Sequence, residues 1–363
     1  MLSLFTMQPP SGDPHYSANP GHSGNRDVSA SVDAPRIWHR KFLTLLFAAC
    51  AMLAASAVAQ DQRSPAKKIG VLWSGTAEGS APYYGAFIQG MRELGWIDGK
   101  TALFIIRVDD NEKSRLPKLA AELVTLGVDV LAVATIATAA ARSATTTIPI
   151  VCTDASDPIL EGHSTTLSRP IGNVTGVSWQ SRETAIKRVE LARELIPGLK
   201  RLGFLYDPSD STVIPELEGL RAAVAGTDVQ LRTFEVRYSR DFPSAFAAIK
   251  RYRPQALIYP TLVLMADNLE RTVHFASDIR LPTFSEGAQF AEAGMFLTYG
   301  VDYLAAYKRA AVQVDKILKG AKPANLPWEQ ATEFELVVNM KTAKALGLTV
   351  PESIMERATR IIR

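Results

Sequence analysis

From residue 67 onward, short runs of β-branched and apolar residues alternate with amphipathic stretches in which apolar side chains recur at helical spacing. This alternation is typical of βαβ units, in which a helix crosses over a sheet and returns the chain to a parallel strand. The first unit has a strand at 67–73 and a helix at 82–94, which begins with a proline and is followed by a glycine. The pattern therefore predicts an α/β fold built on parallel sheets.

The alternation runs in two series of similar length, separated by turn-forming residues at 172–177. The first series continues with strands at 102–108, 130–134 and 148–152 and helices at 114–126 and 136–144. The second has strands at 201–206, 229–236, 256–259 and 282–285 and helices at 215–224, 242–252 and 266–279. A chain of 363 residues is long enough for two domains of ordinary size. We therefore expect two similar lobes, with any ligand site in the loops after the carboxyl ends of the strands.

The most apolar stretch lies near the N-terminus, at 42–59, and follows a cluster of basic residues. It ends in small residues, with Ala59 preceding Gln60, which is typical of a secretory signal and predicts cleavage after Ala59 and export to the periplasm. Residues 1–35 lack apolar periodicity, so 1–59 is expected to be a disordered extension plus signal peptide, unless translation starts further along. Two alternatives stay open: a retained membrane anchor, since about 18 apolar residues just span a bilayer, or a lipid on Cys50.

The composition is that of an ordinary globular protein, with 47% hydrophobic and 21% charged residues. Lysine and arginine together number 40 against 37 aspartates and glutamates, and no basic run interleaved with aromatic residues stands out. A nucleic-acid partner is therefore not expected. After cleavage at Ala59, Cys152 is the one remaining cysteine, so an intramolecular disulfide is not expected either.

The sequence offers little material for catalysis. A phosphate loop ending in Gly99-Lys100-Thr101 would need a glycine where Leu94 stands, and no dinucleotide fingerprint follows a predicted strand. Beyond residue 60 the only histidines are His163 and His274, too few for a histidine metal site or a serine-histidine relay. We therefore expect a non-enzymatic protein without metal or cofactor. A hydrolase or isomerase using Asp154 with Asp157, or Cys152, is the alternative, although Asp157-Pro158 also has the pattern of a helix N-cap.

Nine short segments stand in a fixed order over nearly 300 residues: 67–72, 95–100, 156–159, 172–177, 205–209, 300–303, 317–324, 334–339 and 341–347. In this order they resemble the ABC transporter substrate-binding proteins of the tryptophan/tyrosine-binding type, which have the type I periplasmic-binding-protein fold. The resemblance implies two similar lobes, each a parallel sheet flanked by helices, joined by three crossovers. The first lobe would comprise 66–177 with 299–325, and the second 178–298 with 326–363.

The resemblance also implies a function. A monomeric protein outside the cytoplasm would bind a small molecule in the cleft between the lobes, such as an amino acid or a related compound. It would then deliver this ligand to the permease and ATPase of an ABC importer. The same fold also serves sensors, so the alternative is a periplasmic ligand-sensing module for a signalling partner.

In this family the ligand groups sit in the loops after the strands. By position, the resemblance assigns ligand binding to Ser74, Gly75, Thr135, Asp157, Tyr206, Asp207, Thr261, Ser285 and Glu286. Hydroxyls and backbone N–H groups there suit a carboxylate or amide, and an acidic side chain suits an ammonium group.

Aromatic side chains could form a wall of this site or belong to the core; they are Trp73, Tyr83, Tyr84 and Trp179. One departure from the family pattern concerns charge. Family members usually have Pro-Thr-Asp-Asn where this chain has residues 260–263, so Leu262 replaces an aspartate. Glu286 or Asp207 is then expected to meet the ligand's amino group instead.

Overall fold

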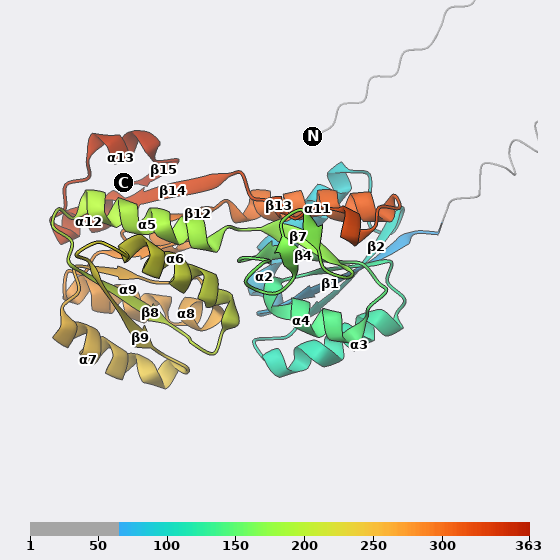
Figure 1. Ribbon diagram of the computed structural model, residues 1–363, viewed down its shortest axis with the longest axis horizontal. Helices are drawn as coiled ribbons and strands as arrows, with labels where there is room; N and C mark the ends of the chain where they lie inside the picture. The colour runs from blue at the N-terminus through green and yellow to red at the C-terminus, as the bar shows by residue number, and fades with distance from the viewer. Residues whose placement is uncertain (1–64) are drawn as a thin grey trace, which may run out of the picture. The chain divides into compact units, whose positions relative to one another are not determined.

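The computed structural model of the protein describes residues 65–363 (Figure 1). The expected extension, the signal peptide at 1–59 and the cleavage site after Ala59 lie outside the described residues. The described chain forms a six-stranded sheet, a seven-stranded sheet and a two-stranded sheet. No helix within it is both long and apolar enough to cross a membrane.

The first large sheet is entirely parallel and has the order β13-β7-β4-β3-β1-β2. Its strands are β1 (Lys67–Trp73), β2 (Ala102–Val108), β3 (Val130–Val133), β4 (Ile150–Ala155), β7 (Val174–Ser178) and β13 (Glu329–Gln330). Its helices are α2 (Ala77–Glu93), α3 (Leu116–Thr125), α4 (Thr135–Ala144) and α11 (Tyr303–Leu318). Strands β5 (Ser164–Thr166) and β6 (Arg169–Pro170) form the small antiparallel sheet.

The second large sheet has the order β15-β14-β12-β11-β10-β8-β9 and is parallel except for the pair β12 and β14. Its strands are β8 (Arg201–Tyr206), β9 (Gln230–Glu235), β10 (Ala256–Ile258), β11 (Thr283–Ser285), β12 (Leu297–Val301), β14 (Phe334–Asn339) and β15 (Arg360–Ile362). Its helices are α5 (Ser181–Leu195), α6 (Ile214–Val224), α7 (Phe242–Tyr252), α8 (Val263–Asp267), α9 (Leu269–Asp278), α10 (Ala288–Glu292), α12 (Met340–Leu346) and α13 (Glu352–Arg357).

Each sheet is buried on both faces, which explains why its strands read as continuous apolar runs rather than alternating ones. On β1, Ile69 and Val71 lie in one buried cluster with Phe87 of α2, whereas Leu72 lies on the other face with Leu119 of α3. The second sheet repeats this arrangement, with separate apolar clusters on its two faces. The structure thus confirms the α/β prediction of two similar lobes, each with a sheet flanked by helices.

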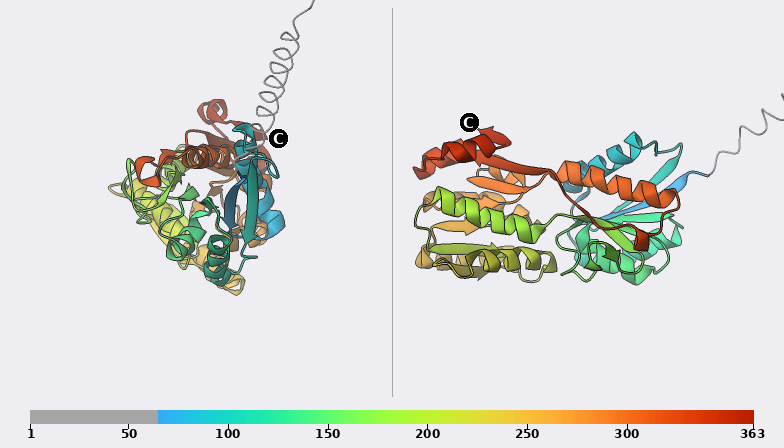
Figure 2. Two further views of the ribbon diagram at one scale, coloured as in Figure 1. Left: turned by 90° about the vertical axis from the view of Figure 1, so that its right-hand side faces the viewer. Right: turned by 45° about the horizontal axis from the view of Figure 1, so that its top comes forward.

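The chain passes between the lobes three times: after β7, after β12 and after β13. Figure 2 shows the result, with the orange helix α11 beside the first sheet and the red segment containing α12 and α13 with the second. Helix α11 crosses α2 closely at Gly90, where a Cβ would lie 3.0 Å from the Cβ of Ala311. A larger residue at position 90 would push the two helices apart.

Strand pairing corrects the expected lobe boundaries by a few residues. Residues 299–301 belong to β12 of the second sheet, not to the first lobe. Residues 329–330 form β13 and pair with β7, so they belong to the first sheet, although 326–363 was expected in the second lobe. A two-residue strand is too short to have a periodicity that a sequence pattern can reveal.

The structure differs from the sequence analysis at several elements. Helix α2 begins at Ala77, with the Thr76 side chain accepting a hydrogen bond from the Gly79 N–H, so Pro82 lies inside the helix rather than at its start. Helix α5 was not predicted at all. The Asp157-Pro158 segment forms a turn rather than a helix start.

Candidate functional site

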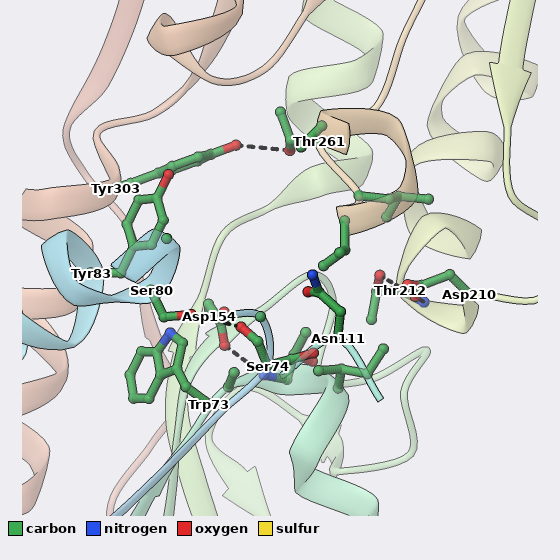
Figure 3. Close-up of a pocket in the computed structure, with 18 of the residues that line it drawn as sticks. Trp73, Ser74, Ser80, Tyr83, Asn111, Asp154, Asp210, Thr212, Thr261 and Tyr303 are labelled. Atoms are coloured by element: carbon green, nitrogen blue, oxygen red, sulfur yellow. Dashed lines mark hydrogen bonds between the residues drawn. The ribbon is translucent and has the colours of Figure 1, made fainter. Parts of the chain in front are cut away.

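A cavity of about 360 Å³ lies between the carboxyl ends of the two sheets. Its walls come from loops that follow β1, β2, β3, β4, β8 and β10, so both lobes contribute, as expected for open α/β sheets. Figure 3 shows the cavity with Tyr303 on one side and Thr212 and Asp210 on the other. The volume falls within the range of small-molecule sites.

The structure brings four of the nine expected site residues to this cavity: Ser74, Gly75, Thr135 and Thr261. The other five lie outside its lining: Asp157, Tyr206, Asp207, Ser285 and Glu286. Each of these five has partners within its own lobe that account for its position.

Three of the five stabilise local backbone. The Asp157 carboxylate accepts hydrogen bonds from the N–H groups of Ile159 at 2.9 Å and Leu160 at 3.1 Å, which is a turn-capping role. The Asp207 carboxylate likewise accepts from the backbone N–H and the hydroxyl of Ser209, at 2.8 and 2.6 Å. The buried Ser285 hydroxyl donates to the Tyr259 carbonyl at 2.6 Å.

The other two belong to the interior of the second lobe. The Tyr206 ring is buried and stacks on Phe204 with ring centroids 5.0 Å apart. Glu286 pairs with the fully buried Arg188, whose Nη2 lies 3.1 Å from Glu286 Oε1 and 2.7 Å from Glu216 Oε1. Burial raises the pKa of Glu216 above its ordinary value, although the neighbouring Arg188 acts to lower it.

Glu286 is nevertheless connected to the cavity through Thr261. The Thr261 hydroxyl donates to Glu286 Oε2 at 2.9 Å and accepts from the Tyr303 hydroxyl at 2.9 Å. Tyr303 directly follows the second crossover, whereas Thr261 follows β10 of the second sheet. The hydrogen bond therefore joins the two lobes at the side of the cavity next to the crossovers.

Five aromatic side chains cluster along the cavity: Trp73, Tyr83, Trp179, Tyr303 and Tyr307. Trp179 stacks on Tyr303 at a centroid distance of 4.4 Å, and Trp73 lies 5.3 Å from Tyr307. Of the four aromatic candidates from the sequence, Tyr84 alone lies outside the cavity lining. Sequence reasoning missed Tyr303 and Tyr307. Their spacing of four residues, which places both on one face of α11, was the available signal.

Buried carboxylates hold the loops of the first lobe in place. Asp109 is fully buried and accepts from the Ser74 hydroxyl and the Gly75 N–H, both at 2.8 Å. Gly75 has φ +112°, and a Cβ there would lie 2.8 Å from the Ser80 hydroxyl, so the loop requires glycine.

Thr135 is held between two further carboxylates. Its N–H donates to Asp154 Oδ1 at 2.6 Å, and its hydroxyl donates to Glu161 Oε2 at 3.0 Å. Tyr307 donates from its hydroxyl to Asp154 Oδ2 at 3.1 Å. Burial raises the pKa of Asp154 to about 6 and that of Glu161 to about 7. Asp154 lines the cavity and lies near the end of β4, where the pairing with β7 shifts register between Cys152 and Ala155.

On the far side of the cavity an ion pair joins the lobes. Lys113 of the first lobe lies with its Nζ 2.9 Å from Asp210 Oδ2 of the second. Asp210 Oδ1 also accepts from the backbone N–H and the hydroxyl of Thr212, which lines the cavity. Neither Asp210 nor Thr212 was a candidate from the sequence.

The chemistry of the lining suits binding. It contains serine, threonine, asparagine, glutamine and aspartate side chains beside the aromatic ones, and no histidine, lysine or arginine. Cys152 is fully buried and does not line the cavity, and burial raises the pKa of its thiol well above the ordinary value. Among residues 65–363, no group of three or more histidine, cysteine and acidic side chains is placed to hold a metal ion.

Two lobes joined by three crossovers, with a cavity between them, define the type I periplasmic-binding-protein fold. The chain belongs to the ABC transporter substrate binding protein family, whose model matches residues 68–362. Members of this family act outside the cytoplasm. This match confirms the resemblance drawn from the nine sequence segments. It also confirms the role of a solute-binding protein for an ABC importer and does not favour the alternative of a ligand-sensing module for a signalling partner.

The chain is similar to several known proteins. It is 24% identical to a tyrosine-binding protein of Clostridioides difficile over 263 residues, which are 72% of this chain and 75% of that relative. A solved conserved domain protein from Vibrio cholerae is 28% identical, with a TM-score of 0.76, covering 81% of this chain and 99% of its own. A solved ABC domain from Streptococcus pneumonia in complex with L-Trp is 25% identical, with a TM-score of 0.75, covering 82% and 100%.

Proposed function

We propose that this protein is an exported, non-enzymatic receptor for an amino acid with an aromatic side chain, or for a closely related compound. The observation that carries this proposal is the aromatic wall of the cavity, in which Trp73, Trp179 and Tyr303 stand beside polar groups from both lobes. A planar apolar group would stack against such a wall, and a few hydrogen-bonding groups would fix its orientation. The tyrosine- and tryptophan-binding relatives support the same choice.

The absence of catalysis is proposed from the partners of the reactive groups. The Ser74 hydroxyl donates to the carboxylate of Asp109, and no histidine lines the cavity, so the lining offers no serine-histidine relay. Asp154 and Asp157, the pair considered for acid-base chemistry, do not share the cavity, because Asp157 caps a turn outside it. The proposed function is capture and release of an unchanged ligand.

The proposal includes the periplasm as the location and the permease and ATPase of an ABC importer as partners. The basic and apolar segment before Ala59 supports cleavage there and release of the mature protein, which we propose to be a monomer. Mass spectrometry of protein from its native host should find Gln60 as the first residue. A chain that retains 42–59, or that carries a lipid on Cys50, would contradict this part of the proposal.

Calorimetric titration of the mature chain with L-tryptophan, L-tyrosine and L-phenylalanine tests the ligand class, with L-leucine and glucose as comparison compounds. Tyr83→Ala should weaken binding of the aromatic amino acids, because Tyr83 lines the cavity. Tyr84→Ala is the matched control, since its ring lies on the same helix but outside the lining. Failure of all three aromatic amino acids to bind would refute the proposed ligand class.

A further inference from the structure

The charged side chains that line the cavity are all acidic. Three aspartates line it, Asp154, Asp210 and Asp267, and no cationic side chain does. Asp210 has its charge neutralised by Lys113 at 2.9 Å, and Asp267 is exposed on helix α8. Asp154 is therefore the carboxylate whose charge the ligand itself must balance.

The contacts of Asp154 leave room for such a partner. Within the described chain it forms no ion pair. Its three hydrogen bonds come from the Thr135 N–H, the Tyr307 hydroxyl and the Thr153 hydroxyl, whose one proton is shared with the Val133 carbonyl. A carboxylate accepts about four hydrogen bonds. Two of the three go to Oδ1, so Oδ2 keeps the free accepting capacity. A protonated amine at Oδ2 would add the missing hydrogen bond and the missing positive charge together.

Aromatic rings lie near the same position. Tyr307, which donates to Asp154, has its ring 5.3 Å from that of Trp73 and 5.6 Å from that of Tyr83. Figure 3 shows Asp154 on the side of the cavity that Trp73 and Tyr83 also line. Aromatic faces attract cations, and this attraction grows where water is excluded. A carboxylate together with these rings is a suitable environment for an ammonium group.

The two residues expected from the sequence to meet an amino group lie outside the cavity lining. Asp207 caps a turn, and Glu286 is engaged by Arg188 and Thr261 behind the cavity wall. Leu262, which replaces the usual family aspartate, lines the cavity as an apolar residue. In this chain the carboxylate left to meet the amino group is therefore Asp154, which lines the cavity on the first lobe.

We propose that Asp154 binds a protonated amino group of the ligand, and that the site selects amine cations bearing an apolar ring, with no requirement for a ligand carboxylate. The inference deepens the proposed function and rests on it. A ligand carboxylate would find hydroxyls and backbone N–H groups but no positive side chain, so it adds less to the affinity than the amine does.

Three probes with one indole skeleton separate these contributions: L-tryptophan, tryptamine, which lacks the carboxylate, and indole-3-propionate, which lacks the amine. Titration of the full mature chain at pH 7.5 should find tryptamine within about tenfold of L-tryptophan. Indole-3-propionate should bind at least about 30-fold more weakly, the usual cost of losing a charged partner in a desolvated site.

Asp154→Asn tests the residue itself and should weaken tryptamine and L-tryptophan by about 30-fold or more. Asp278→Asn is the matched control, because Asp278 is exposed on helix α9 and lies outside the cavity lining, so both affinities should change by less than about threefold. The comparison of the three probes on the unmodified protein stands even if Asp154→Asn fails to fold.

The outcomes distinguish the two proposals. Indole-3-propionate binding as tightly as tryptamine overturns the amine preference but leaves an aromatic ligand in place. L-Tryptophan binding equally to the parent and to Asp154→Asn overturns the role of Asp154 alone. If neither the aromatic amino acids nor tryptamine bind, the proposed ligand class is refuted and the amine preference with it.

Discussion

The ion pair between Lys113 and Asp210 gives a direct test of whether ligand binding closes the lobes. It joins the first lobe to the second on the side of the cavity opposite Tyr303 (Figure 3), so opening the lobes would separate the two charges. The Asp210 side chain is 6% exposed and the Lys113 side chain 43% exposed. The pair is thus more desolvated than an ordinary surface ion pair.

The expected magnitude follows from these surroundings. Exposed ion pairs contribute about 0.2–1 kcal/mol, and hydrogen bonds to charged groups about 1.5–3 kcal/mol. After Lys113→Ala, Asp210 still accepts two hydrogen bonds from Thr212, so the loss stays near the boundary of these ranges. We expect about 1–1.5 kcal/mol, which is about a fivefold to tenfold weaker affinity. The stability of each separate lobe should change little, because the pair connects the lobes rather than supporting either.

The assay is a double-mutant cycle with Lys113→Ala, Asp210→Asn and the double variant, measured by titration with the tightest-binding amino acid of the panel. The cycle removes the separate effect of Asp210 on Thr212. The control is Lys118→Ala. It removes an equal charge from the same lobe, at a residue that forms no ion pair within residues 65–363. Solution scattering should show a smaller radius of gyration with ligand for the parent. A coupling energy within about 0.3 kcal/mol of zero, or no change in radius at saturating ligand, would refute the closing mechanism.

Three further predictions concern the remaining buried and capping groups. Arg188→Met should lower the free energy of unfolding in urea by about 3–5 kcal/mol, because it leaves Glu216 and Glu286 buried without their cation. The control Arg221→Met, at an exposed residue, should lower it by less than about 1 kcal/mol. Equal effects of the two variants would contradict the role given to the cluster. Burial raises the pKa of Glu161 to about 7, so the folded state binds this proton more tightly than the unfolded state does. The stability that this group contributes therefore falls as the pH rises from about 4.5 through 7. Melting curves between pH 5 and pH 8 should show a smaller fall in stability for Glu161→Gln than for the parent, and an equal fall would contradict this role of Glu161. Asp157→Ala should lower the free energy of unfolding by about 1 kcal/mol, because the turn loses its hydrogen bonds to the Asp157 carboxylate, and should leave ligand affinity unchanged. A tenfold loss of affinity in titration would instead show that Asp157 takes part in ligand binding.

Elements with a strong local pattern could be predicted from the sequence with accurate bounds. The strands at 67–73, 102–108 and 201–206 and the helix at 242–252 have the same limits in the structure. Their apolar residues repeat at strand or helix spacing, and both signals are local. Helix α5 lacks such a clear stripe because the fully buried Arg188 stands on its inner face. That charge is acceptable there only because Glu216 and Glu286, distant in the sequence, lie beside it.

The candidate site could be predicted only in part, for a related reason. Position after a strand identified Ser74, Gly75, Thr135 and Thr261, because the carboxyl ends of parallel strands meet at one edge of a sheet. The same rule also selected Asp207 and Ser285, whose side chains turn back to their own loop or strand. A position in a loop therefore indicates the edge of the sheet but not the direction of the side chain.

The sequence by itself determined the fold class, the two lobes and the family, because apolar periodicity and the order of short motifs require no knowledge of distant contacts. Only the tertiary structure decided which charges meet. It placed Asp154 in the cavity lining and brought Tyr307, from a helix about 150 residues later, within hydrogen-bonding distance of it. It also paired Glu286 with Arg188 outside the lining. These outcomes depend on three crossovers of the chain between two sheets, and the electrostatic character of a site depends on residues that only such crossovers bring together.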